Sequence, residues 1–380
     1  MEVVFIICIG WVAYVYVGYP LLVMLLAILF RSSPIKKAFQ PSVTILIPAY
    51  NEKEHIAATI ENKLSLNYPK DKIQIIVISD ESEDGTDDIV QSYADKGVQL
   101  VRQEPRRGKT SGLNLAVPKA SGEILVFSDA NSIYDVDALL YMMENFSDKS
   151  VGYVTGKMVY TNSNGAVIGD GCGAYMRYEN FIRKHETLLN SVVGVDGGVD
   201  AVRRELYQPM NADQLPDFVL PLNVVEQGRR VVYEERALLK EDSLSSTSSE
   251  YRMRVRVSLR AMWALLDKRA LLNPVRFPVF GWELISHKLL RYLIFIPQLL
   301  LVLLNLMLLA DGAIYWLFAL LQAVFYMLAY MGYLAEREGK HASFVMTLPY
   351  YFVVVNAASA QAFWMFLKGN KVVLWTPRVG

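Results

Sequence analysis

Two oxygen-bearing side chains, Asp129 and Asn131, follow directly after an apolar run at residues 124–127. Four apolar residues in a row are typical of a buried strand in a parallel sheet. Open α/β sheets bind ligands at the carboxyl ends of such strands, and hard divalent cations prefer oxygen ligands. We therefore predict a metal site that holds a nucleotide diphosphate. The structural alternative is an Asx turn that leaves the strand.

Two earlier strands of the predicted sheet also end in polar side chains. Residues 42–47 lead to Asn51 and Glu52, and residues 73–79 lead to Asp80. Strand and helix patterns alternate four times before Asp129, which predicts a doubly wound parallel sheet. The three strand ends would then lie at one edge, where they favour a nucleotide site.

A basic loop precedes the strand at residues 124–127. Gly108-Lys109-Thr110 is similar to the end of a phosphate-binding loop, but that motif requires a glycine where Gln103 stands. This departure excludes a P-loop ATPase. Arg106, Arg107 and Lys109 remain candidate charge partners for phosphate groups, with a solvated basic loop as the alternative.

Several segments in order resemble the family 2 glycosyltransferases, the inverting group that includes the synthases of hyaluronan, chitin and cellulose. The resemblance covers about residues 41–239, and its segments are residues 43–52, 77–86, 108–114, 129–131, 197–206 and 215–228. It implies a GT-A fold, an α/β domain with a Rossmann-like, mostly parallel sheet. It also implies a nucleotide site formed by Pro48, Tyr50, Glu52, Asp80, Lys109 and Asp129.

The resemblance implies that Asp129 and Asn131 bind Mn²⁺ or Mg²⁺. Many members of the family have a second aspartate where this chain has Asn131, so the site carries less negative charge. Asp80 is implied to contact the base of the nucleotide.

Asp217 is the candidate catalytic base. The family has an acidic pair at this point, and Asp217 is the one acid that remains here, after Pro216. A carboxylate can take the proton from an acceptor hydroxyl as that hydroxyl attacks, and a helix start keeps the carboxylate ionised. A plain helix cap is the alternative. Gly197 and Gly198 would let the backbone approach a sugar closely.

A second, weaker set of acceptor or diphosphate contacts comprises Gly197, Gly198, Arg256, Arg260 and Trp263. Polysaccharide-forming members carry a Gln-x-x-Arg-Trp motif near this position. If Arg260 is its arginine, Val257 replaces the glutamine and Trp263 lies two residues too late. The departure weakens a prediction of processive polymer synthesis.

The composition indicates a membrane protein, because 53% of its residues are hydrophobic. We predict an N-terminal transmembrane anchor at 1–31, a GT-A domain at 40–245 and amphipathic, interfacial helices at 250–285. Residues 289–367 would hold the C-terminal transmembrane helices, with two spans at 289–309 and 313–335 and a third span or re-entrant segment at 343–367. Pro297 is expected to kink the first of these spans.

Basic residues after the anchor, Arg31, Lys36 and Lys37, place the α/β domain on the cytoplasmic side of the plasma membrane. Three later spans would put the C-terminus outside, whereas Lys368, Lys371 and Arg378 favour the inside. A re-entrant segment at 343–367 or a dipping interfacial segment would remove the conflict.

These observations predict a metal-dependent inverting transferase that moves a sugar from a nucleotide sugar, with UDP favoured, to a lipid-linked or polysaccharide acceptor. Membrane lipids are expected partners and a homo-oligomer is compatible with the sequence. The formal net charge of +0 gives no indication of nucleic acid, and two cysteines cannot form a disulfide framework. The alternative is a membrane transporter or channel with a nucleotide-sensing cytoplasmic domain.

Overall fold

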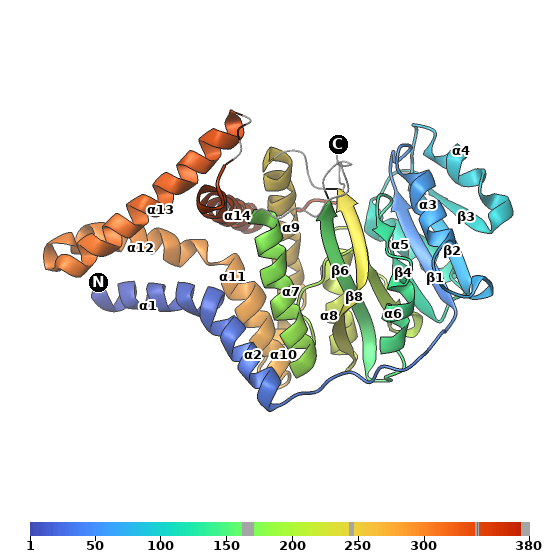
Figure 1. Cartoon of the computed structure of the whole chain (residues 1–380), viewed down its shortest axis with the longest axis horizontal. Helices are drawn as coiled ribbons and strands as arrows, with labels where there is room; N and C mark the ends of the chain where they lie inside the picture. Colours follow the sequence, from blue (N-terminus) through green and yellow to red (C-terminus); the bar gives the residue numbers. More distant parts are fainter. Residues whose placement is uncertain (162–170, 243–246, 339, 341, 374–380) are drawn as a thin grey trace.

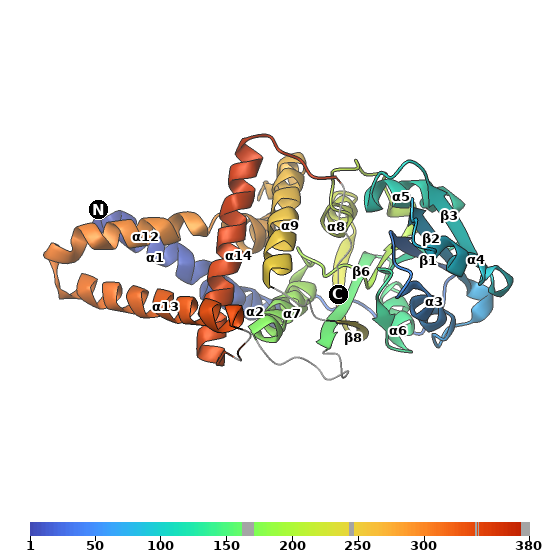
Figure 2. The same ribbon diagram turned by 90° about the horizontal axis from the view of Figure 1, so that it is seen from above.

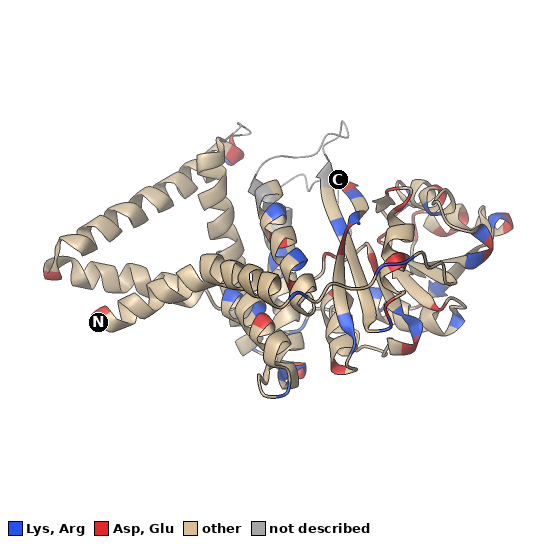
Figure 3. Cartoon of the chain, turned by 60° about the horizontal axis from the view of Figure 1, so that its bottom comes forward, with Lys and Arg blue, Asp and Glu red and all other residues tan. Residues whose placement is uncertain are grey.

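The computed structural model describes residues 1–161, 171–242, 247–338, 340 and 342–373. An α/β domain with one sheet lies at one end of the long axis, and apolar helices project from the other end (Figures 1 and 2). Lys, Arg, Asp and Glu are concentrated on the α/β domain and on the helices beside it, while the projecting helices are almost free of them (Figure 3).

The described residues form an eight-stranded sheet in the order β3-β2-β1-β4-β7-β6-β8-β5. The strands are β1 Val43–Ala49, β2 Ile73–Asp80, β3 Val98–Gln103, β4 Ile124–Phe127, β5 Ile133–Tyr134, β6 Val151–Thr161, β7 Asp200–Arg203 and β8 Arg230–Asp242. The pairs β1–β2, β1–β4, β2–β3 and β6–β8 are parallel, and β4–β7, β6–β7 and β5–β8 are antiparallel. The prediction of a mostly parallel α/β sheet is confirmed.

Helices cover both faces of this sheet. The α/β domain contains α3 Ile56–Leu64, α4 Thr86–Gln91, α5 Lys109–Ala116, α6 Ala138–Asn145, α7 Gly171–Leu189 and α8 Pro216–Glu226. Alternate residues of β1 point to opposite faces, as the pleat of a strand requires. Ile45 and Ile47 pack with α3, α4 and α6, whereas Leu46 packs with α5, α8 and the helices that follow α8.

The remaining helices lie outside the sheet: α1 Glu2–Ala13, α2 Tyr19–Leu29, α9 Thr247–Asp267, α10 Pro278–Leu284, α11 Leu290–Tyr292, α12 Phe295–Leu308, α13 Ala313–Arg337 and α14 Phe344–Leu367. Three helical segments are long and apolar enough to cross a membrane, at Glu2–Leu29, Ala313–Arg337 and Phe344–Leu367. The helix pair Pro278–Tyr292 and Phe295–Asp311 passes the same test as one segment, with a bend of 55°.

This bend breaks the continuous span that the sequence predicts at 289–309. The break lies at Leu293 and Ile294. Pro297 explains its position, because a proline ring clashes with the carbonyl four residues earlier, which here belongs to Leu293. The expected kink at this proline is therefore observed.

Helix α14 runs across the direction of α1, α12 and α13. It is seen end-on in Figure 1 and along its length in Figure 2, where the other three helices keep the direction of the long axis. It packs along α9 through a core that includes Val255, Leu259, Ala358 and Ala362. Hydropathy predicts a membrane segment here, but its direction is a tertiary feature.

A buried polar cluster joins the apolar helices to α7. The imidazole of His287 lies 2.7 Å from Glu186 and 3.2 Å from Glu179, and the hydroxyl of Tyr19 donates a 2.6 Å hydrogen bond to Glu186. Arg291 pairs with Glu179. Because breaking a buried pair leaves an uncompensated charge, this cluster fixes α2 and α11 relative to α7.

Candidate active site

The sheet brings the predicted residues to one edge, where β4 ends and the antiparallel β7 begins. Phe127 pairs with Asp200 in the register of these two strands. Asp129 lies two residues beyond Phe127, and the glycine pair Gly197-Gly198 lies just before Asp200. Segments about 70 residues apart in sequence therefore meet at one point, because the antiparallel pairing places the start of β7 beside the end of β4.

Two glycines in the left-handed conformation separate the candidate base from the candidate metal ligand. Gly197 and Gly198 have φ of +77° and +74°. A Cβ at Gly197 would lie 2.9 Å from Asp217 Oδ2, and a Cβ at Gly198 would lie 3.2 Å from Asp129 Oδ2. A side chain at either position would be strained by the left-handed backbone and would press against a carboxylate, so both positions favour glycine.

Lys109 joins the two carboxylates. It begins α5, and its Nζ lies 2.8 Å from Asp129 Oδ1 and 3.5 Å from Asp217 Oδ1. Burial lowers the pKa of Lys109, but the charges of Asp129 and Asp217 outweigh burial and raise it above its ordinary value. A permanently charged ammonium at this point can bind a diphosphate.

Side chains of α3 and β5 form hydrogen bonds with the backbone of the loop that carries Asp129 and of the segments beside it. Lys63, fully buried on α3, donates a 2.6 Å hydrogen bond to the Ser132 carbonyl. The Tyr134 hydroxyl lies 2.7 Å from the carbonyl of Gly198 and 2.8 Å from that of Phe127. Tyr134 therefore ties the metal loop to the glycine pair, which fixes the positions of both carboxylates.

Asp200 is a buried carboxylate that sequence reasoning missed. It is 0% exposed, and within the described chain neither of its carboxylate oxygens has a hydrogen-bond partner. Burial, and then the nearby charge of Asp217, raise the pKa of Asp200 from its ordinary 3.8 to about 8. Burial thus favours the neutral form of the Asp200 carboxyl, which lies near the charged Lys109 and Asp217.

The donor set at Asp129 and Asn131 fits a hard cation. Asn131 Nδ2 lies 3.5 Å from Glu241 Oε1, so a second carboxylate stands beside the amide. The described residues contain no cluster of three or more His, Cys, Asp or Glu that could hold a metal alone. Mg²⁺ and similar ions use one or two carboxylates and complete their shells with substrate phosphates, so this sparse oxygen set is compatible with one.

The predicted nucleotide residues lie at the ends of β1 and β2. Pro48 is buried within β1, and Tyr50 and Glu52 follow it half-buried. The Arg106 guanidinium lies 3.4 Å from the centre of the Tyr50 ring, a cation–π contact. The Tyr50 ring and the Arg106 guanidinium together form a flat surface. This surface lies beside Asp80, whose carboxylate is 3.4 Å from Arg106.

Asp80 holds the basic loop in place. It is 2% exposed, and its carboxylate accepts hydrogen bonds from the backbone N–H of Arg107 at 2.9 Å and of Gly108 at 3.0 Å. The Gln103 amide donates to it as well. The carboxylate implied to contact a base is thus already used to shape the loop that precedes Lys109.

The two arginines of α9 differ in their surroundings. Arg260 is 8% exposed and donates to backbone carbonyls of Asp213 and Gln214, just before α8. Burial and the charge of Arg256 lower the pKa of Arg260 to about 10. Arg256 is half-buried and makes no hydrogen bond or ion pair within the described chain, while its charge is felt by Asp217. Of these two arginines, Arg256 is the one whose donors have no partner among the described residues.

Trp263 lies apart from the carboxylates. Its indole N–H donates a 2.9 Å hydrogen bond to the Asn370 carbonyl, and its ring packs on Phe366 at 4.6 Å. Beyond that contact the chain returns to the basic loop, where the Val373 carbonyl would lie 3.2 Å from a Cβ at Gly108. No sequence signal pointed to this return of the C-terminal segment.

Comparison with known proteins assigns the α/β domain. Residues 44–208 match the family described as Glycosyl transferase family 2. The probable glycosyltransferase YdaM of Bacillus subtilis (strain 168) is 34% identical over 129 residues, which are 32% of this chain and 31% of that protein. The poly-beta-1,6-N-acetyl-D-glucosamine synthase of Staphylococcus aureus (strain COL) is 27% identical over 63% of this chain.

This chain spans 59% of the staphylococcal synthase and less of YdaM. Among solved structures, the mannosyltransferase PcManGT from Pyrobaculum calidifontis, in complex with GDP-Man and Mn²⁺, is similar over 97% of this chain and 99% of that one. Its TM-score is 0.72 at 21% identity. The likeness shows a common fold, a GT-A domain with attached apolar helices, as predicted. Residues 44–208 thus match family 2 of the glycosyltransferases in sequence, and the chain shares the fold of PcManGT.

Proposed function

We propose that the chain is a metal-dependent, inverting glycosyltransferase that moves a sugar from a nucleotide sugar to an acceptor hydroxyl at the membrane surface. The observation that carries this proposal is the meeting of Asp129, Lys109 and Asp217 around the glycine pair, within a family 2 domain. A diphosphate site and a carboxylate base then lie side by side, which a single displacement requires.

In this mechanism Asp217 takes the proton from the acceptor hydroxyl as its oxygen attacks the anomeric carbon. The new oxygen–carbon bond forms on the side of the anomeric carbon opposite the diphosphate. The bond between that carbon and the diphosphate breaks, and the nucleoside diphosphate leaves. Lys109 and Arg256 bind the charge that develops on the departing diphosphate. The glycine pair would let the backbone approach the sugar closely beside the two carboxylates.

Asp129, with Asn131 and the neighbouring Glu241, would hold Mn²⁺ or Mg²⁺. Such an ion neutralises charge on the diphosphate as a Lewis acid. For the donor we propose a UDP-sugar. GDP-mannose, the ligand of PcManGT, is the second donor to test. Tyr50 and Arg106 form the flat surface on which the base would stack, with Asp80 fixing that surface from behind.

For the membrane arrangement we propose three crossings, with the α/β domain in the cytoplasm of the plasma membrane. The crossings are α1–α2, the segment Phe295–Asp311 that contains α12, and α13, and α14 lies along the inner surface. Its direction across the other helices supports this assignment, as does the contact of residue 373 with the basic loop (Figure 2). Arg31, Lys36, Lys37, Lys368 and Lys371 then all lie inside.

The test is turnover of the purified full chain with a panel of UDP-sugars and GDP-mannose. Each reaction contains Mn²⁺ or Mg²⁺ and is repeated with EDTA, and the product is analysed by size. We expect metal-dependent nucleotide release together with a sugar-bearing product. One added sugar supports single transfer to a lipid-linked acceptor, and a ladder of chains supports polymerisation. Nucleotide release without any glycosylated product, unchanged by Asp217→Asn, would refute the proposal and favour the nucleotide-sensing transporter hypothesis.

A further inference from the structure

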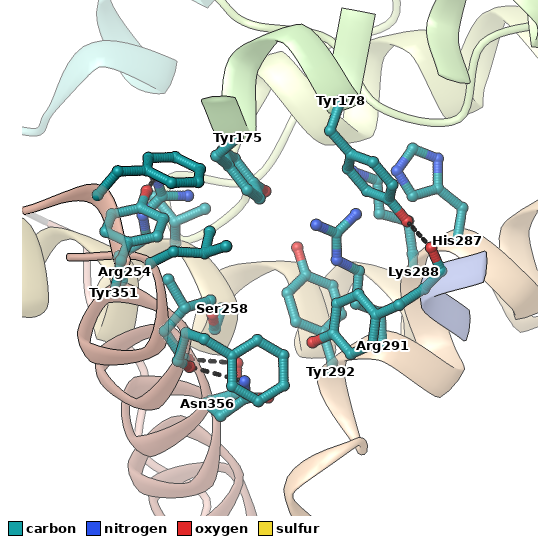
Figure 4. Close-up of a pocket in the computed structure, with 17 residues that line it drawn as sticks. Tyr175, Tyr178, Arg254, Ser258, His287, Lys288, Arg291, Tyr292, Tyr351 and Asn356 are labelled. Carbon is teal, nitrogen blue, oxygen red and sulfur yellow. Dashed lines mark hydrogen bonds between the residues drawn. The ribbon is translucent and has the colours of Figure 1, made fainter. Parts of the chain in front are cut away.

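A cavity of about 340 Å³ lies between the α/β domain and the apolar helices, apart from the carboxylates described above. Its walls are formed by α7, α9 and α14, by the helical turns Tyr14–Gly18 and Ile285–Leu289, and by α11 (Figure 4). Its size is within the range of pockets that bind small ligands.

The polar side of this cavity is cationic. Arg254, Lys288 and Arg291 line it, and its lining contains no Asp or Glu. Glu179 stands behind Arg291 and pairs with it. Lys288 makes no hydrogen bond or ion pair with any described residue. An ammonium that faces a cavity without a partner indicates an anionic ligand, because buried charges in proteins are normally paired.

Arg254 lies on the opposite side of the cavity from Arg291 (Figure 4). It contacts the hydroxyl of Tyr351, and its guanidinium is 5.2 Å from the ring of Tyr175. Guanidinium and ammonium groups around one space are typical of phosphate sites. Tyrosine hydroxyls at the rim add neutral donors for the groups attached to the phosphate.

The other side of the cavity is apolar and belongs to α14. Phe344, Leu348, Phe352 and Val355 line it. Phe344 is 54% exposed and Leu348 is 43% exposed, so the cavity wall continues onto the apolar outer surface of α14. A cationic end beside an apolar exit fits a phosphate group that carries a hydrocarbon chain, and not a free anion alone.

The cavity is connected to the catalytic carboxylates by two elements. Helix α9 presents Arg254 and Ser258 to the cavity. Arg256 and Arg260 each follow two residues later, which corresponds to a turn of about 200° around the helix, so they lie on the side of Asp217. The glycine loop is the other element. A methyl group at Gly194 would collide with the Lys288 ammonium, and Gly197 borders Asp217.

Gly194 and Gly197 are three residues apart, and three extended residues span at most about 11 Å. Because Gly194 abuts Lys288 and Gly197 abuts Asp217, the Lys288 ammonium and the Asp217 carboxylate are no more than about 20 Å apart. A lipid phosphate that carries one or a few sugars can bridge such a separation. We propose that this cavity binds the phosphate group of a lipid-linked acceptor and directs its glycan toward Asp217. The inference rests on the proposed transferase function and names the acceptor class.

The experiment measures binding of farnesyl phosphate to the purified full chain in phosphatidylcholine nanodiscs, with farnesol and inorganic phosphate as comparison probes. We expect saturable binding of farnesyl phosphate, no saturable binding of farnesol and much weaker binding of inorganic phosphate. Equal binding of farnesol would overturn the phosphate part of the proposal. Equal binding of inorganic phosphate would overturn the lipid part.

Lys288→Met removes the unpaired cation, and Arg254→Gln removes a cation from the opposite wall. Each is expected to weaken farnesyl phosphate binding about tenfold or more, as loss of one charge-assisted hydrogen bond predicts. Lys340→Met is the matched control, because this exposed lysine pairs with Glu338 on the connection between α13 and α14, away from the cavity lining. Unchanged binding in both cavity variants, or equal weakening in the control, would overturn the site.

Nucleotide-sugar binding is measured on the same variants. Unchanged donor binding shows that the variants are folded, and loss of transfer to a lipid-phosphate acceptor, but not of donor binding, links the cavity to the acceptor. Transfer at the wild-type rate by Lys288→Met would overturn the acceptor assignment. If the wild-type chain binds no nucleotide sugar, the proposed function fails, while the farnesyl phosphate measurement still tests the cavity independently.

Discussion

Gly197→Ala tests whether the glycine pair sets the position of the catalytic base. The new Cβ would lie 2.9 Å from Asp217 Oδ2, whereas ordinary contacts begin near 3.4 Å, so the carboxylate must retreat by about 0.5 Å. A displacement of 1 Å in an active site can cost about a hundredfold in rate, so we expect transfer to fall between about tenfold and about a hundredfold. The left-handed backbone adds about 1–2 kcal/mol of instability.

Gly228→Ala is the matched control. Gly228 has φ of +73° and no neighbouring atom within 4 Å of an added Cβ. It should therefore show the same loss of stability without loss of transfer. The assay compares kcat, donor affinity and thermal midpoint for the two variants. Wild-type kcat in Gly197→Ala, or an equal fall of kcat in Gly228→Ala, would refute the reasoning.

Three further substitutions test the charges of the site. Asp200→Asn should stabilise the protein more at pH 9 than at pH 5. The reason is that a carboxyl whose pKa is raised in the folded state makes the folded protein less stable as the pH rises from about 4 to about 8. Equal effects at both pH values in thermal unfolding would contradict this. Lys109→Met should weaken nucleotide-sugar binding about tenfold or more, because it removes the cation 2.8 Å from Asp129; calorimetry that gives wild-type affinity would count against it. Asn131→Asp should tighten Mn²⁺ binding, since a second carboxylate would stand beside Glu241, and weaker binding by paramagnetic resonance would argue against a metal at this amide.

The sequence predicts those parts of the fold that depend on local pattern. Apolar runs that end in polar side chains marked β1, β2 and β4, and adjacent parallel strands then brought Asp80 and Asp129 to one edge of the sheet. Asp217 was identified by its flanking residues, and the structure brings it to Lys109. The metal and base roles themselves stay predictions.

Other features depend on tertiary packing that no local pattern encodes. Lys63 has the sequence context of a surface lysine on a helix, yet it is fully buried beneath the Asp129 loop. Asp200 lies in a short strand, and its burial follows from the sheet order. Hydropathy gives the length of α14 but not its direction, so the side of the C-terminus was left open by the sequence. The cavity cations lie on two segments that are distant in sequence, Arg254 on α9 and the pair Lys288 and Arg291 on the helical segment Pro278–Tyr292.

The most direct test of the central claim is the turnover of Asp217→Asn beside that of Glu226→Gln. Glu226 lies on the same helix and pairs with Lys268, away from the glycine pair. With saturating nucleotide sugar, metal and acceptor, we expect Asp217→Asn to lose about 10²- to 10⁴-fold in kcat, the usual contribution of a general base, while donor affinity stays the same or increases. Glu226→Gln should retain wild-type kcat. Normal turnover by Asp217→Asn would contradict the assignment of the base and with it the mechanism.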